Sequence, residues 1–120
     1  MKDIKPNIIK QTENGKVFKC SKCNLLHVEF KNLNFNLTLA QYKHLADYIQ
    51  NLNGSEWEDI NSESNFSRKI MIPIGHQNIN IMFNIDELAE FNSLLNEHQL
   101  NTPYRKHYKT SIFDFYFFLN

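Results

Sequence analysis

The chain has 120 residues, and its 13 basic and 13 acidic side chains cancel to a formal net charge of zero. This length predicts a single domain over residues 1–120, large enough to bury a core without a disulfide or a metal. Hydrophobic residues make up 42% of the chain, which argues against disorder. The neutral balance argues against nucleic acid or an anionic membrane as a partner. With no long apolar run and only two cysteines, the sequence predicts a cytoplasmic protein without a membrane span.

The first half of the chain predicts a strand-rich segment followed by a helix. Asn14-Gly15 is a strong turn signal, and apolar alternation predicts strands over residues 16–20, 26–30 and 33–37. Thr38 and Gln41 have the spacing of a capping box, which predicts that a helix begins there. The apolar stripe of this helix ends near Gly54, the expected stop, and residues 53–66 are polar and turn-rich.

The second half repeats this pattern. Apolar alternation predicts strands over 70–74 and 79–83, and a helix follows from Asn84 to about His98. A shift of about 46 residues aligns these elements with those of the first half, which is the pattern of a repeated unit. We therefore predict an α+β fold, an antiparallel sheet with two helices on one face, built as two pseudo-repeated ββα units over 16–54 and 66–98. The expected core is Leu26, Val28, Phe30, Leu33, Phe35, Leu45, Ile49, Ile72, Ile81, Phe83, Phe91 and Leu95.

The cysteines offer one candidate site. Cys20 and Cys23 have the spacing of half a tetrahedral zinc site, in which a hairpin turns two thiolates toward one point. His27 and His76 are the nearest further ligands by strand geometry, and a second chain is another source. A lone CxxC supplies half of a ligand set, so the sequence favours two half-buried thiols in a turn without a cofactor. The alternative is a zinc site with Cys20, Cys23 and His27 as its ligands.

Other chemistry is less well supported by the sequence. A redox Cys pair gains its low thiolate pKa from a helix behind the first Cys, whereas the residues after Cys23 alternate as a strand. His27 and Glu29 share one strand face, but no nucleophile motif accompanies them. The basic and aromatic segment 104–109 would suit a phosphate backbone, but no basic stripe occurs elsewhere. We predict that the protein is not an enzyme.

The C-terminal tail over residues 99–120 is strongly aromatic. An exposed segment of this kind is prone to β aggregation, so we expect it to be covered. Its own sheet is one cover, and exchange with a second copy is the other. The predicted interaction residues are Phe113, Phe115, Tyr116, Phe117 and Phe118.

Five segments carry a resemblance to a known family: residues 18–23, 28–32, 37–39, 68–73 and 84–95. Together they resemble a family of small uncharacterised Bacteroidota proteins, a domain of unknown function. Members tend to have glycine where Lys31 stands, and some carry extra N-terminal cysteines. Residues 1–15 contain none, so the resemblance does not extend to a four-cysteine metal site. It supports the fold prediction and implies no known activity.

These observations favour a non-catalytic cytoplasmic interaction or regulatory module that self-associates or binds a protein partner. A small zinc-stabilised domain, acting as a nucleic-acid adaptor, is the alternative. A CxxC thiol redox protein is the third hypothesis.

Overall fold

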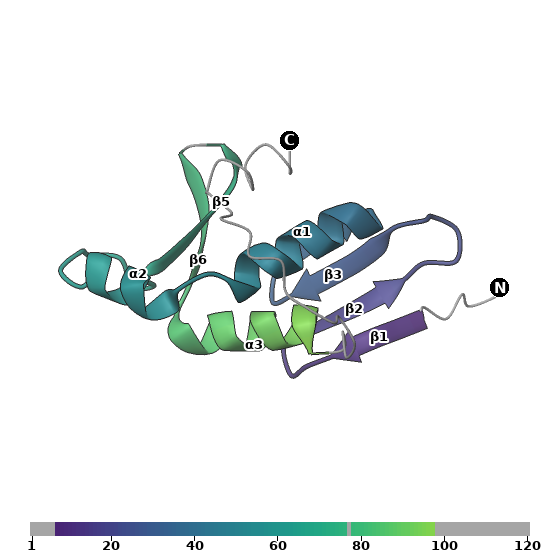
Figure 1. Ribbon diagram of the computed structural model, residues 1–120, viewed down its shortest axis with the longest axis horizontal. Helices are drawn as coiled ribbons and strands as arrows, with labels where there is room; N and C mark the ends of the chain where they lie inside the picture. The colour runs from purple at the N-terminus through teal and green to yellow at the C-terminus, as the bar shows by residue number, and fades with distance from the viewer. Residues whose placement is uncertain (1–6, 77, 98–120) are drawn as a thin grey trace.

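The computed structural model of the chain describes residues 7–76 and 78–97 (Figure 1). These described residues form a four-stranded sheet, a two-stranded sheet and three helices, which confirms the predicted α+β class. The elements in chain order are β1 (Asn7–Gln11), β2 (Gly15–Lys19), β3 (Leu26–Phe30), β4 (Leu33–Leu37), α1 (Leu39–Gln50), α2 (Gly54–Ile60), β5 (Ile70–His76), β6 (Ile79–Phe83) and α3 (Ile85–Asn96).

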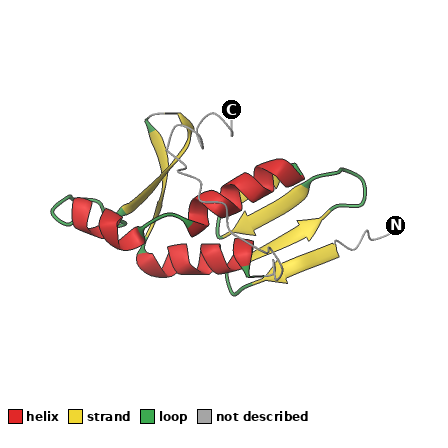
Figure 2. Ribbon diagram, viewed as in Figure 1, coloured by secondary structure: helices red, strands yellow, loops and turns green. Residues whose placement is uncertain are grey.

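The larger sheet is an antiparallel meander in the order β1-β2-β3-β4, and α1 and α3 cover one of its faces (Figure 2). In the register of β2 and β3, Val17 lies opposite Val28, and both are fully buried. The neighbouring pair, Phe18 and His27, therefore points to the face away from the helices. This alternation places His27 outside the core.

Both predicted capping boxes are present. Thr38 accepts a hydrogen bond from the backbone N–H of Gln41, and Asn84 accepts one from Glu87, at 3.2 and 2.8 Å. In each case the backbone N–H of the cap donates to the side chain three residues on. Each capping box thus pairs two backbone N–H groups at the start of its helix that have no partner within the helix. Each helix directly follows a hairpin, so both ββα arrangements occur in the structure.

The buried apolar residues of the described part of the chain form one core between the sheets and the helices. Tyr42 on α1 donates a 2.6 Å hydrogen bond to the carbonyl of Leu95 on α3, and burial raises the pKa of Tyr42. Four residues of the expected core are only partly buried and pack at its margin: Leu26, Leu33, Phe35 and Ile81. The other eight are buried as predicted: Val28, Phe30, Leu45, Ile49, Ile72, Phe83, Phe91 and Leu95.

The strands divide between two sheets instead of forming one. β5 and β6 pair only with each other among the described strands, with an irregularity between Pro73 and His76. Ile70, Ile72 and Phe83 at the base of this hairpin are buried, whereas Ile74 and Ile79 farther along are exposed. The base of the hairpin thus packs into the core while its far end projects away. Apolar alternation predicts which face of a strand is buried, but it does not predict which strands pair at an edge.

Residues 53–60 differ from the prediction. Gly54 does not stop α1, which ends at Gln50 with Asn51 as its cap; it is the first residue of α2, capped by Asn53. A Cβ at Gly54 would lie 2.9 and 3.0 Å from the ends of the Ile85 and Leu88 side chains, so any larger residue would require these ends to shift. Glycine fits this close approach of α2 and α3 without such a shift.

Strand β1 was not expected, because residues 7–11 lack clear alternation; Ile8 and Ile9 are both exposed. The turn between β1 and β2 is attached to α3 through Glu90. This carboxylate accepts hydrogen bonds from the Thr12 hydroxyl, the Asn14 backbone and the Asn14 side chain, each at 2.8 Å. Within the described ranges, no helix has the length and apolar character needed to cross a membrane.

Candidate metal centre

The three predicted ligands lie together at one end of the β2–β3 hairpin. Cys20 follows β2 directly, Cys23 lies in the connecting loop, and His27 is the second residue of β3. Because β2 and β3 are antiparallel, the loop folds back over the start of β3 and brings both thiols toward the imidazole. All three residues are half-buried, so the site is accessible from the surface.

The distances suit a tetrahedral cation with sulfur and nitrogen ligands. Cys20 Sγ, Cys23 Sγ and one ring nitrogen of His27 lie within 4.8 Å of one another. Cys23 Sγ and His27 Nε2 are 3.2 Å apart. With the usual zinc bond lengths, tetrahedral ligands stand about 3.5–3.8 Å apart. Closing this triad around zinc therefore requires shifts of only about 1 Å, and a structural site needs a fourth ligand besides these three.

Asn36 on β4 orients the imidazole. His27 Nδ1 lies 2.7 Å from Asn36 Oδ1, and the Asn36 amide nitrogen donates to Asn34 Oδ1 at 2.9 Å. Because the Asn36 oxygen is an acceptor, Nδ1 carries the proton and the lone pair of Nε2 points toward Cys23. Metal-binding histidines in proteins are held by the same second hydrogen bond. The site is therefore preorganised to present a nitrogen ligand.

The ring of Phe18 on β2 covers one side of the same imidazole. The two rings stack with centroids 5.0 Å apart and an interplanar angle of 29°. This contact follows from the register, since Phe18 and His27 are paired across β2 and β3. Phe18 and Asn36 thus fix the plane of His27 from the two neighbouring strands.

The Cys20 thiol is activated by the loop. Backbone N–H groups of Lys22 and Cys23 stabilise the thiolate and lower the pKa of Cys20 to about 7. The Lys22 N–H lies 3.5 Å from the sulfur. A thiolate is the form of cysteine that binds metals and that acts as a nucleophile, so this side chain is prepared for either chemistry near neutral pH.

We expect alkylation of metal-free Cys20 by iodoacetamide to rise with pH around a midpoint near 7. The lowered pKa means that the thiolate is present above this value and is lost as the pH falls through it. Peptide mass spectrometry over roughly pH 5.5–9.5, which brackets both the lowered and the ordinary thiol pKa, measures the midpoint. A midpoint above about 8.5, that of an ordinary cysteine, would show that the loop does not activate the thiol.

The other candidates from the sequence do not join this site. Glu29 forms an ion pair with Lys16 at 3.8 Å and is exposed. His44 is half-buried on α1. The side chain of His76 lies outside what the structure describes, as do His98, the basic segment and the five aromatic interaction residues of the tail.

Residues 20–25 form a loop that leads into β3, so a helix does not follow Cys20. The lowered pKa of Cys20 arises from the N–H groups of the loop instead. Asn36 and Phe18 were missed as site residues. The signal that could have found them is strand register, since both stand opposite His27 once β2, β3 and β4 are paired.

Comparison with known proteins identifies a family for this chain. The profile of a family of unknown function, DUF6686, matches the chain over residues 1–120. The chain belongs to this family. The resemblance to a domain of unknown function is therefore confirmed. No curated protein and no solved structure matches the chain. The function of this family is unknown, so membership assigns no activity, and the function is inferred from the site.

Proposed function

We propose that this DUF6686 protein is a small, non-catalytic interaction module stabilised by a zinc ion. In this proposal, Cys20, Cys23 and His27 supply three of the ligands. The ion joins the loop after β2 to the start of β3, as structural zinc joins the two arms of a hairpin knuckle. The proposal includes a cytoplasmic location, because free thiols persist in reducing compartments.

The observation that supports zinc most strongly is the orientation of His27. A half-exposed histidine without a role is free to rotate, whereas this imidazole is held by Asn36 and Phe18 with its Nε2 toward the thiols. Two soft sulfur ligands and one imidazole favour zinc over calcium or magnesium, which prefer oxygen ligands.

A thiol redox function is the second candidate, favoured by the lowered pKa of Cys20. The two functions predict opposite behaviour toward oxidants. Zinc-bound thiolates are protected until the metal is removed, whereas a redox pair forms a reversible disulfide without a metal. The oriented histidine would be a metal ligand in the first function and would stabilise a thiolate in the second.

Cobalt substitution tests the proposed coordination. We expect Co²⁺ added to reduced, metal-free protein to give the intense visible absorption of tetrahedral cobalt together with thiolate-to-metal charge-transfer bands. Zinc should displace it, because affinity for zinc is generally the higher. The variant Cys23→Ser should lose part of the charge-transfer intensity, and Ser21→Ala, a change inside the same loop, should not. Octahedral spectra, or spectra unchanged in Cys23→Ser, would contradict the proposed site.

We further expect Asn36→Ala to weaken zinc affinity by about 10- to 100-fold, as loss of a hydrogen bond to a metal-bound histidine does. The thiols remain in this variant, so the reduction in affinity reports the orientation of His27. Competition with a chromophoric chelator measures the zinc affinity. Asn65→Ala, at an exposed loop position, is the matched control. Equal affinities in the two variants would show that Asn36 does not position a metal ligand.

The proposed interaction function includes self-association through the aromatic tail. The residues concerned lie outside the described part of the chain, so this part of the proposal is supported by the sequence alone. The tail contains seven apolar residues in the run of eight over 112–119. A run of this kind favours burial against another surface.

A further inference from the structure

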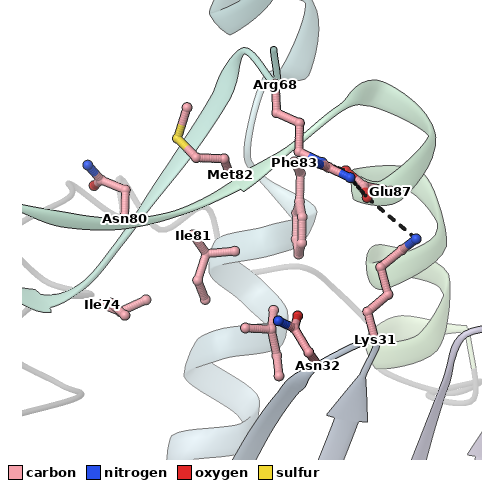
Figure 3. Close-up of a pocket in the computed structure, with 10 residues that line it drawn as sticks. Lys31, Asn32, Arg68, Ile74, Asn80, Ile81, Met82, Phe83 and Glu87 are labelled. Carbon is pink, nitrogen blue, oxygen red and sulfur yellow. Dashed lines mark hydrogen bonds and ion pairs between the residues drawn. The ribbon is translucent and has the colours of Figure 1, made fainter. Parts of the chain in front are cut away.

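A cleft separates the β3–β4 turn from the β5–β6 hairpin (Figure 3). Its volume is about 430 Å³, within the range of small-molecule sites. His27 lies near the start of β3, whereas the cleft lies beside the turn that follows the end of this strand. The cleft is therefore distinct from the proposed metal centre. Its accessible apolar wall consists of Leu33, Ile74 and Ile81, with the buried ring of Phe83 behind it. Its charged end consists of Lys31, Arg68 and Glu87.

The charged end carries an excess of positive charge. Arg68 donates to both oxygens of Glu87, from Nε at 2.6 Å and from Nη2 at 3.0 Å, and Lys31 Nζ lies 3.5 Å from the same carboxylate. The side chain of Glu87 is 8% exposed, while those of Lys31 and Arg68 are 41% and 49% exposed. Among the residues that line the cleft, two cations thus face one buried carboxylate. A second carboxylate near Lys31, that of Glu90, accepts hydrogen bonds from Thr12 and Asn14 and does not line the cleft.

Both cations have donors beyond those directed at Glu87. Arginine has five N–H donors, and Glu87 engages only the Nε and Nη2 groups of Arg68. The ammonium of Lys31 has three donors. The hydrogen bonds from Arg68 lower the pKa of Glu87 to about 2, so the carboxylate stays ionised and keeps the guanidinium in place at neutral pH. A positioned cation pair is suited to binding a further carboxylate.

Lys31 occupies an unfavourable backbone conformation. It begins the two-residue connection between β3 and β4 with φ of 54°, a region that glycine adopts more easily. When a non-glycine residue in a strained conformation places its side chain at a cleft, that side chain is a candidate for a functional role. Glycine would suit this backbone conformation better, so what lysine adds at this position is its side chain with the ammonium group.

From these contacts we infer that the cleft binds a small organic anion, a carboxylate with an apolar body. The carboxylate lies against Lys31 and Arg68, and the apolar part lies on Leu33, Ile74 and Ile81. In Figure 3 the side chains of Ile81 and Phe83 point toward the β3–β4 turn, with Lys31 and Glu87 at one end of the space. This function is independent of the metal centre.

The test is a titration of the full-length, isotopically labelled protein with 3-phenylpropionate, followed by amide chemical shifts. We expect saturable shifts confined to the residues around the cleft. The neutral isostere 3-phenylpropanamide should bind about tenfold more weakly, because charge-assisted hydrogen bonds are lost. Higher salt should weaken binding of the anion and leave the amide unaffected.

Lys31→Gly removes the cation and relieves the backbone, so the fold is expected to keep or raise its melting temperature. This variant should bind 3-phenylpropionate about tenfold more weakly. Lys43→Ala, which removes an equal charge at an exposed position of α1, should bind normally.

Equal affinity for the acid and its amide, or normal binding by Lys31→Gly, would overturn the inference. So would the absence of shifts at the cleft. If Phe115→Asp in the tail shifts the cleft amides before any probe is added, the chain's own tail occupies the cleft and the inference is also wrong.

Discussion

Replacing Phe91 with alanine is expected to lower the free energy of unfolding by about 3–5 kcal/mol. Phe91 on α3 is 1% exposed and stands at the centre of an aromatic cluster. Its ring centroid lies 5.0 Å from that of Phe30 and 5.4 Å from that of Phe83. Truncation therefore removes the contacts that join the larger sheet, the β5–β6 hairpin and α3, and it leaves a cavity between them.

Urea denaturation of the purified protein measures this change, with Phe66→Ala as the control. Phe66 is 50% exposed, so its truncation should change stability by no more than about 0.5 kcal/mol. Phe91→Leu keeps much of the volume and should lie between the two variants, which preserves the test if the alanine variant does not fold. A loss below about 1 kcal/mol for Phe91→Ala would place the core elsewhere.

Removing zinc is expected to lower the free energy of unfolding by about 4 kcal/mol when free zinc stands about 1,000-fold above its dissociation constant. The reason is mass action, because the metal binds the folded arrangement of Cys20, Cys23 and His27 and only weakly the unfolded chain. Thermal or urea unfolding with and without a chelator measures the difference. Cys23→Ser should show a smaller effect of the chelator than the parent protein does.

Ser21→Ala is again the matched control, since it alters the loop without removing a ligand. It should retain the full dependence on zinc. If the chelated protein unfolds at the same denaturant concentration as untreated protein, the cysteines form a plain turn and the stabilising role is refuted.

The helices and hairpins that the sequence predicted well are those set by local interactions. Thr38 with Gln41 and Asn84 with Glu87 satisfy helix N–H groups within one turn, so their spacing is visible in the sequence. The inward direction of Val28 and Phe30 follows from strand alternation in the same way. These features depend on neighbours only a few residues away.

What the sequence did not predict depends on contacts across the fold. Gly54 resembled a helix stop, but it is the first residue of α2, at a place that Ile85 and Leu88 of α3 approach closely. Strand β1 has little pattern of its own, and its turn is attached through Glu90, more than 70 residues away. Partial burial of Phe35 at the margin of the core likewise follows from packing rather than alternation.

The candidate site shows the same division. The spacing of Cys20 and Cys23 and the strand position of His27 were sufficient to predict a triad, and the structure brings the three ligand atoms together. The partners that orient His27 come from two other strands, Phe18 on β2 and Asn36 on β4. They become visible only when the register is known, because each stands across the sheet from the imidazole.

The zinc content of protein purified without an affinity tag tests the central claim most directly. After dialysis against metal-free buffer, elemental analysis is expected to find about one zinc per chain, with the content falling sharply in Cys23→Ser. Half this value would indicate a site shared by two chains. Less than about a tenth of a zinc per chain, in fully reduced and stably folded protein, would contradict the proposed function.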